Sequence, residues 1–281
     1  STGGTGKTPM VAWVVRRLQQ QGRKPAILTR GYKAHHGVSD EAELLAAGTG
    51  ADVFVQADRV AGAAGATAAG ADVCVMDDGF QHLRLRRDFN IVLVDATQPV
   101  GTRHCPPCGL MREGLGAIRD AQAVVLTRCD LASEAELAEW ERRVRAAAPG
   151  VVVARAVHQP VSVLDEAGAR LGVDALAGRK VLAFCGLGNP GAFFKTIEGL
   201  GATLVDAVSL GDHAAYRQGD LAGLEARALA LGADALVTTE KDYVKLARLQ
   251  RRGTLWRLAV EIRFVAGERE LTQKLDAAVF R

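Results

Sequence analysis

The amino-acid sequence predicts an α/β protein with a doubly wound, mostly parallel sheet and a smaller α/β lobe in its C-terminal part. Short runs of Val, Leu and Ala, bounded by Gly and Asp, recur along the chain, as is typical of strands buried on both faces of a parallel sheet. Stretches of helical periodicity lie between several of these runs. The composition, 48% hydrophobic in 281 residues, allows one large core or two modest ones without metals or disulfides.

The first half of the chain is predicted to form one doubly wound unit. Residues 8–21 place five apolar side chains on one face at helical spacing, and Gly22 follows as the cap of this helix. Strands are then expected at residues 26–29, 52–55, 73–76, 91–94 and 124–127. Further helices are expected at residues 40–47 and 58–69. In such a sheet, ligands bind beyond the carboxyl ends of the strands.

The second half is predicted to form the smaller lobe. Strands are expected at residues 151–154, 181–184 and 235–238, and helices at 190–200 and from about 271. Between the halves, the stretch from His158 to Gly178 is polar and poorly periodic. We therefore predict a core domain over residues 1–157, a linker over 158–178 and a C-terminal lobe over 179–281.

Charge and cysteine content exclude few functions. The formal charge of +3 and the pI near 8.7 do not by themselves argue for nucleic-acid binding, but they suit an anionic substrate or an acidic membrane surface. Five cysteines, an odd number without a signal peptide, are expected as reduced thiols in a cytoplasmic protein. No apolar run approaches the roughly 18–20 residues that span a bilayer, so any membrane contact is expected to be peripheral.

The chain begins with a phosphate-binding pattern. Residues 1–8, STGGTGKT, fit G-x-x-x-x-G-K-[ST] except that Ser1 replaces the first glycine. Lys7 supplies charge to the β- and γ-phosphates of ATP, and the Thr8 hydroxyl is a ligand for Mg²⁺. Because such a loop follows a strand, we expect the natural chain to have residues before Ser1. The residues expected to bind ATP are Thr2, Gly3, Gly4, Thr5, Gly6, Lys7 and Thr8.

Two carboxylates follow the predicted strand at residues 73–76. Asp77 and Asp78 lie at the position where a P-loop enzyme holds a hydrated Mg²⁺ that faces the phosphate loop. Acidic pairs at strand ends also form turns or cap helices. With the preceding loop, we predict that Thr8, Asp77 and Asp78 hold the metal, which makes the first half a P-loop NTPase-like core.

Further short polar clusters lie where loops leave the predicted strands, and each alone could be a solvated surface cluster or a helix cap. The clusters are Arg30-Gly31-Tyr32, Asp40-Glu41, Asp58-Arg59, Asp77–His82, Arg112-Glu113, Asp212-His213 and Thr239–Asp242. In this order, with the long run from Asp77 to Asp95 and the segment Gly188–Phe194, the sequence resembles the tetraacyldisaccharide 4'-kinase family over nearly its whole length.

The resemblance implies an ATP- and Mg²⁺-dependent kinase. Its acceptor is the 4'-hydroxyl of a tetraacyl glucosamine disaccharide 1-phosphate, and its product is lipid IVA of lipid A biosynthesis. The resemblance also implies peripheral contact with the anionic cytoplasmic face of the bacterial inner membrane, without nucleic acid or an obligate protein partner. The residues that match the family's catalytic pair are Asp40 and His213, with Lys7 on the nucleotide. The positions that match its sugar-phosphate contacts are Tyr32, Arg59, Gln81, Arg112 and Glu113.

The sequence departs from the family pattern near the predicted catalytic acid. Ser39–Ala42 replaces Gly-Asp-Glu-Pro, and only residues 33–38 separate it from the Arg-Gly-Tyr cluster, where the family has a longer insertion. The number and length of acyl chains accepted stay open.

Other readings of single motifs also stay open. Cys105 and Cys108 form a C-x-x-C pair, which could supply half of the ligands of a zinc site. Alternatively, the two prolines between them form a rigid turn. The arginines between Leu83 and Asp88 could contact anionic lipid headgroups or form a solvated basic face. Thr127–Asp130 resembles the base-reading segment of a P-loop GTPase. A nucleotide switch, or a kinase of a small soluble metabolite, is therefore the alternative function.

Overall fold

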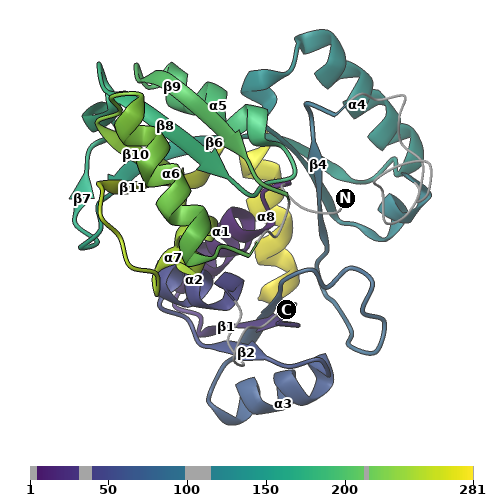
Figure 1. Cartoon of the computed structure of the whole chain (residues 1–281). Coiled ribbons are helices and arrows are strands. Elements are labelled where there is room, and N and C mark those ends of the chain that lie inside the picture. Colours follow the sequence, from purple (N-terminus) through teal and green to yellow (C-terminus); the bar gives the residue numbers. More distant parts are fainter. Residues whose placement is uncertain (1–4, 32–39, 99–114, 212–214, 281) are drawn as a thin grey trace. The chain divides into compact units, whose positions relative to one another are not determined.

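The computed structural model describes residues 5–31, 40–98, 115–211 and 215–280. The chain divides into two compact units, which are residues 1–158 with 262–281, and residues 159–261. Both units are α/β, and most strand pairs of the described residues are parallel, whereas β6 pairs antiparallel with β7 (Figure 1). The predicted fold class is therefore confirmed.

The first unit contains a small parallel sheet with the strand order β2-β1-β3. Its strands are β1 (Pro25–Thr29), β2 (Val53–Val55) and β3 (Val73–Met76). Helices α1 (Lys7–Gln20), α2 (Asp40–Thr49) and α3 (Arg59–Ala68) pack on these strands. The backbone amide of Asp77 donates to the Leu28 carbonyl at 3.0 Å. This bond extends the pairing of β1 and β3 by one residue and fixes the acidic pair at the carboxyl edge of the sheet.

The remaining strands of this unit run β4-β5-β6 in parallel. They are β4 (Ile91–Asp95), β5 (Ala123–Thr127) and the first part of β6 (Val152–Leu164). Short 3-10 helices lie at Leu115–Asp120 and Cys129–Leu131. Helix α8 (Glu268–Val279) joins α1 through an ion pair between Arg17 and Asp276 at 2.8 Å.

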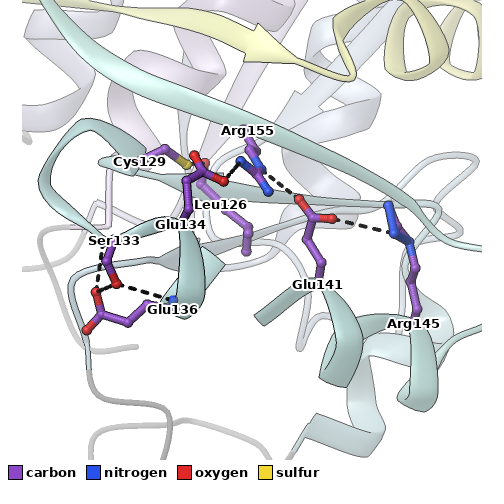
Figure 2. Close-up of polar contacts among 8 residues, drawn as sticks. All are labelled: Leu126, Cys129, Ser133, Glu134, Glu136, Glu141, Arg145 and Arg155. Atoms are coloured by element: carbon purple, nitrogen blue, oxygen red, sulfur yellow. Dashed lines mark hydrogen bonds and ion pairs between the residues drawn. The ribbon is translucent and has the colours of Figure 1, made fainter. Parts of the chain in front are cut away.

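Helix α4 (Glu134–Ala147) is anchored at both its start and its side (Figure 2). Ser133 and Glu136 form a capping box, which satisfies amide groups at the helix start. Arg155 on β6 binds Glu141 of the helix at 2.6 Å and Glu134 at 2.8 Å. Together with the wholly buried Trp140, these contacts hold β6 in place beneath the helix.

The second unit contains a parallel sheet with the order β11-β10-β8-β9. Its strands are β8 (Lys180–Cys185), β9 (Thr203–Ser209), β10 (Ala235–Thr239) and the first part of β11 (Leu255–Ala266). The short strand β7 (Arg170–Leu171) pairs antiparallel with the end of β6. Its helices are the 3-10 helix Val173–Leu176, α5 (Pro190–Gly199), α6 (Gln218–Ala230) and α7 (Glu240–Leu246).

The unit boundaries differ from the predicted domain limits. Residues 158–178, predicted as a linker, contain the end of β6, strand β7 and a 3-10 helix. Residues 262–281, predicted in the C-terminal lobe, cluster with the first unit. The physical reason is that β6 and β11 are long strands, of 13 and 12 residues, and each passes from one unit into the other.

Candidate active site

The described part of the phosphate loop is the turn that enters α1. Gly6 caps the helix with φ 91°, in the left-handed region that side chains other than glycine adopt at a cost. Its carbonyl accepts from the Met10 amide at 3.1 Å. The first turn of α1 has no acidic residue, so the positive end of the helix is not offset by a carboxylate of its own. This end suits a phosphate group.

The end of β5 holds the loop from below. Thr5 is 5% exposed, and its carbonyl accepts from the Thr127 hydroxyl at 3.1 Å. The next residue, Arg128, has φ 57° and forms a buried ion pair with Asp95 at the end of β4. Arg128 and Asp95 therefore bind each other. This geometry does not favour the guanine-reading alternative for the Thr127–Asp130 segment.

Lys7 and Asp78 meet at the carboxyl edge of the small sheet. The distance from Lys7 Nζ to Asp78 Oδ1 is 3.5 Å, and both side chains are partly exposed. Asp78 adopts φ 55°, a left-handed conformation that Asp tolerates better than most residues. The first residue of α1 and the second residue after β3 thus present opposite charges to the same space.

Asp77 is the buried member of the acidic pair. It is 4% exposed, and its Oδ1 atom has no hydrogen-bond partner among the described residues. Burial raises its pKa to about 6, the negative charges of Glu41 and Asp78 act in the same direction, and Lys7 and Arg59 oppose them. A carboxylate held in this way is stabilised by a cation placed beside it.

This acidic pair is the part of the structure that fits Mg²⁺. The described residues include no cluster of three His, Cys, Asp or Glu side chains that could form a complete metal cage. Mg²⁺ instead binds through one or two carboxylates, with waters and substrate phosphates as its other ligands. Asp77 and Asp78, with the Thr8 hydroxyl at the start of α1, are oxygen donors that the described residues offer for such an ion.

Arg59 lies behind the acidic pair, not at the surface. It is 5% exposed, and it donates to the Gln56 carbonyl at 2.6 Å and to the Asp77 carbonyl at 3.5 Å. Burial lowers its pKa, whereas the charge of Asp77 raises it. In this arrangement the guanidinium ties the end of β2 to the end of β3. The predicted contact of Arg59 with the sugar remains a prediction.

Gln81 lies at the rim of the site. Together with Lys7, Asp77 and Asp78 it lines a cavity of about 1360 Å³ in the first unit. The turn that carries Gln81 is held by Arg87, which donates to the carbonyls of Gly79, Phe80 and His82. Arg87 is thus a structural residue of this turn, whereas the side chain of Arg86 is 90% exposed.

The predicted catalytic pair is described only in part. Asp40 is the first residue of α2 and is partly exposed. Its predicted partner His213 lies outside the described residues. The same holds for a set of other predicted positions, which are Thr2, Gly3, Gly4, Tyr32, Cys105, Cys108, Arg112 and Glu113. The described cysteines, Cys74, Cys129 and Cys185, are free thiols.

The Thr-Glu-Lys-Asp cluster of the second unit is a buried network. Asp242 is wholly buried and accepts from the Gly186 amide at 2.9 Å and the Thr239 hydroxyl at 2.8 Å. Lys245 pairs with it at 3.2 Å. Through Thr239 and Asp242 the motif therefore joins the ends of β8 and β10 at the start of α7.

Sequence reasoning did not identify the residues that support the phosphate loop from below. Thr127 donates to the Thr5 carbonyl, and His158 lies against Gly6. Asp95, at the end of strand β4, and Arg128, directly after strand β5, pair with each other. These contacts depend on strand order, which the sequence does not state.

Comparisons with known proteins agree with this geometry. The family model LpxK, described as tetraacyldisaccharide-1-P 4'-kinase, matches residues 1–279. A tetraacyldisaccharide 4'-kinase of Anaeromyxobacter sp. (strain Fw109-5) is 41% identical, with 100% of this chain and 81% of that protein covered. One of Geobacter metallireducens is 37% identical, with 93% and 81% covered.

A solved structure supports the same assignment. The crystal structure of an "apo" form of LpxK from Aquifex aeolicus in complex with ATP superposes with a TM-score of 0.70 at 26% identity, covering 99% of this chain and 86% of that chain. The match of the family model extends over both units and includes every predicted site residue. The chain therefore belongs to the tetraacyldisaccharide-1-P 4'-kinase family.

Proposed function

We propose that this chain transfers the γ-phosphoryl group of ATP to the 4'-hydroxyl of a tetraacyl glucosamine disaccharide 1-phosphate, giving lipid IVA in lipid A biosynthesis. The single observation that carries the proposal is the meeting of Lys7 with Asp77 and Asp78 at one sheet edge, in a chain that matches the family over residues 1–279. Phosphoryl transfer depends mostly on positioning and on neutralising charge, and this edge provides both.

Each described residue has a distinct task in this proposal. The amide groups at the start of α1 and the Lys7 ammonium hold the β- and γ-phosphates. Mg²⁺ would be held by Asp77, Asp78 and Thr8, and when bound it neutralises charge on the phosphate oxygens. Arg59 keeps the two strand ends together, so that both carboxylates keep their place when the cation and the nucleotide leave.

The residues proposed to bind the sugar acceptor are assigned from the family's motif pattern. Asp40, at the start of α2, would accept or orient the proton of the sugar hydroxyl, and His213 would orient and tune that carboxylate. Gln81 stands at the rim of the same cavity as Lys7, which supports a contact with the sugar. Tyr32, Arg112 and Glu113 complete the proposed set of sugar-phosphate contacts.

The membrane location is proposed as peripheral, on the cytoplasmic face of the inner membrane. Within the described residues, the longest apolar helices fall short of what a membrane crossing requires. The turn after Gln81 carries Leu83, which is 83% exposed, and the exposed side chains of Arg84 and Arg86. An apolar tip with flanking cations suits an anionic lipid surface.

The test is consumption of ATP by the purified protein in detergent micelles that contain Mg²⁺. We expect ATP turnover to depend on the tetraacyl disaccharide 1-phosphate and to disappear when Mg²⁺ is chelated. The Lys7→Ala variant serves as the control for contaminating kinases, because it removes the positive charge that is proposed to stabilise the transferred phosphoryl group. Turnover that is independent of the lipid, or faster with GTP, would contradict the proposal.

A further inference from the structure

The imidazole of His158, on β6, lies against the last glycine of the phosphate loop. A Cβ atom on Gly6 would be 2.3 Å from Nε2 and 3.0 Å from Cε1 of this ring. Both distances are too short for non-bonded atoms, so the ring occupies the space that a side chain at Gly6 would need. The contact is one residue before Lys7, at the point where the loop enters α1.

The ring brings a polar atom to this contact. Nε2 of His158 is buried and has no hydrogen-bond partner among the described residues. Burial lowers the pKa of His158 to about 4, Arg128 acts in the same direction and Asp95 opposes it. The imidazole is therefore neutral at neutral pH, with one nitrogen as donor and the other as acceptor. A buried polar atom without a partner is unfavourable, and its partner is expected to arrive with a ligand or a change in the loop.

The elements around His158 are joined by side-chain contacts. β6 is tied to α4 through Arg155, three residues earlier (Figure 2). Thr127, on the neighbouring strand β5, holds the Thr5 carbonyl, and the buried pair of Asp95 and Arg128 lies beside the ring. Residues on both sides of the His158 ring are thus held by hydrogen bonds and ion pairs.

We infer that His158 is a positioning residue for the nucleotide. Its ring supports Gly6 and so fixes the height and direction at which Lys7 and the start of α1 meet the phosphates. Its Nε2 atom, which has no partner among the described residues, is available for a hydrogen bond when the nucleotide is bound. This inference rests on the proposed function, because it assigns a role in ATP binding by the same loop.

The test compares two replacements of the ring. His158→Leu keeps an apolar side chain of similar bulk but removes both nitrogens, whereas His158→Gln keeps an amide near the position of Nε2. We expect His158→Leu to raise the KM and the Kd for ATP about tenfold, the effect of one lost hydrogen bond in a buried site. The KM for the lipid should stay unchanged, and His158→Gln should recover most of the ATP affinity.

Val157→Ala is the matched control. Val157 precedes His158 on β6 but packs in the cluster with Leu126 and Trp140, so its side chain faces away from the loop. This variant should lower the melting temperature without changing the KM for ATP. It separates loss of fold stability from loss of loop positioning.

The possible results distinguish failure of the proposed function from failure of the proposed role of His158. If wild-type protein binds no ATP, the proposed function fails and this inference fails with it. If wild-type protein binds ATP and His158→Leu binds it equally well, only the role of His158 is refuted. If His158→Gln is no better than His158→Leu, the hydrogen-bonding role of Nε2 is refuted. In NMR spectra, an ATP-dependent shift of the ring signals that His158→Gln assigns to His158 by their disappearance is the direct support expected, and ring signals that ATP leaves unchanged would argue against the role.

Discussion

Replacing Asp77 by asparagine is predicted to stabilise the nucleotide-free protein while it destroys phosphoryl transfer. Burial raises the pKa of Asp77 from 3.8 to about 6, so the ionised carboxylate is less favourable in the folded chain than in the unfolded one. One pKa unit corresponds to about 1.4 kcal/mol. At pH 7, therefore, keeping this group ionised costs about 3 kcal/mol of folding free energy.

The sign and the pH window follow from the two pKa values. Below about pH 4 the carboxyl is protonated in both states, and it costs nothing. As the pH rises from about 4 to about 6, the unfolded chain loses its proton first, so folding stability falls; above about 6 the loss is complete. Asp77→Asn removes this dependence, because an amide is neutral throughout. The predicted gain is about 3 kcal/mol at pH 7 and under about 1 kcal/mol at pH 4.

Thermal denaturation in the presence of a chelator measures this gain. For a chain of this size, about 3 kcal/mol corresponds to a rise of roughly 6 °C or more in melting temperature. Asp78→Asn is the control, because Asp78 is partly exposed and pairs with Lys7, so its replacement should give no comparable gain. An Asp77→Asn variant that is less stable than wild type at pH 7, or equally stabilised at pH 4 and pH 7, would refute the reasoning.

Three further predictions test other parts of the account. Asp40→Ala should lower kcat by about 10²–10⁴-fold with little change in ATP affinity, whereas Glu43→Ala on the same turn of α2 should not; equal activity of both in a steady-state kinase assay would remove Asp40 from the mechanism. Arg128→Met should destabilise the first unit by about 3–5 kcal/mol in urea unfolding, because it leaves a buried carboxylate unpaired; an unchanged midpoint would contradict this. Leu83→Ser should weaken co-sedimentation with anionic vesicles, whereas Leu229→Ser, at an equally exposed leucine, should not; equal loss in both would argue against the proposed membrane turn.

The strands of the first unit were accessible from sequence because they are continuous apolar runs. β1, β3, β4 and β5 each coincide with a predicted strand to within a residue or two. Strands β9 and β11 were missed, since charged side chains interrupt their apolar residues, Asp206 in β9 and Arg257, Glu261 and Arg263 in β11. Strands interrupted in this way give a weaker sequence signal than the continuous apolar runs from which the other strands were predicted.

Helix α4 shows a signal that was present but unused. Its sequence is rich in Glu and Arg, yet Leu137, Trp140 and Val144 recur at helical spacing and are buried. The capping box of Ser133 and Glu136 marks its first residue. Here the pattern was sufficient to predict the helix.

For the site, the sequence indicated candidate residues but not their environment. Lys7 and Asp78 were placed opposite each other from the motif order, and they do meet. The burial of Asp77, the inward position of Arg59 and the contact of His158 with Gly6 depend on packing between segments far apart in the chain. Residue types and spacing alone do not contain that information.

The measurement that tests the central claim most directly is 31P NMR of the lipid after reaction with ATP and Mg²⁺. The account predicts a second phosphate monoester signal beside that of the 1-phosphate, coupled to the proton at the 4' position, with loss of the γ-phosphate signal of ATP. A lipid that keeps a single phosphate while ATP is hydrolysed, or a new phosphate at another position, would contradict it.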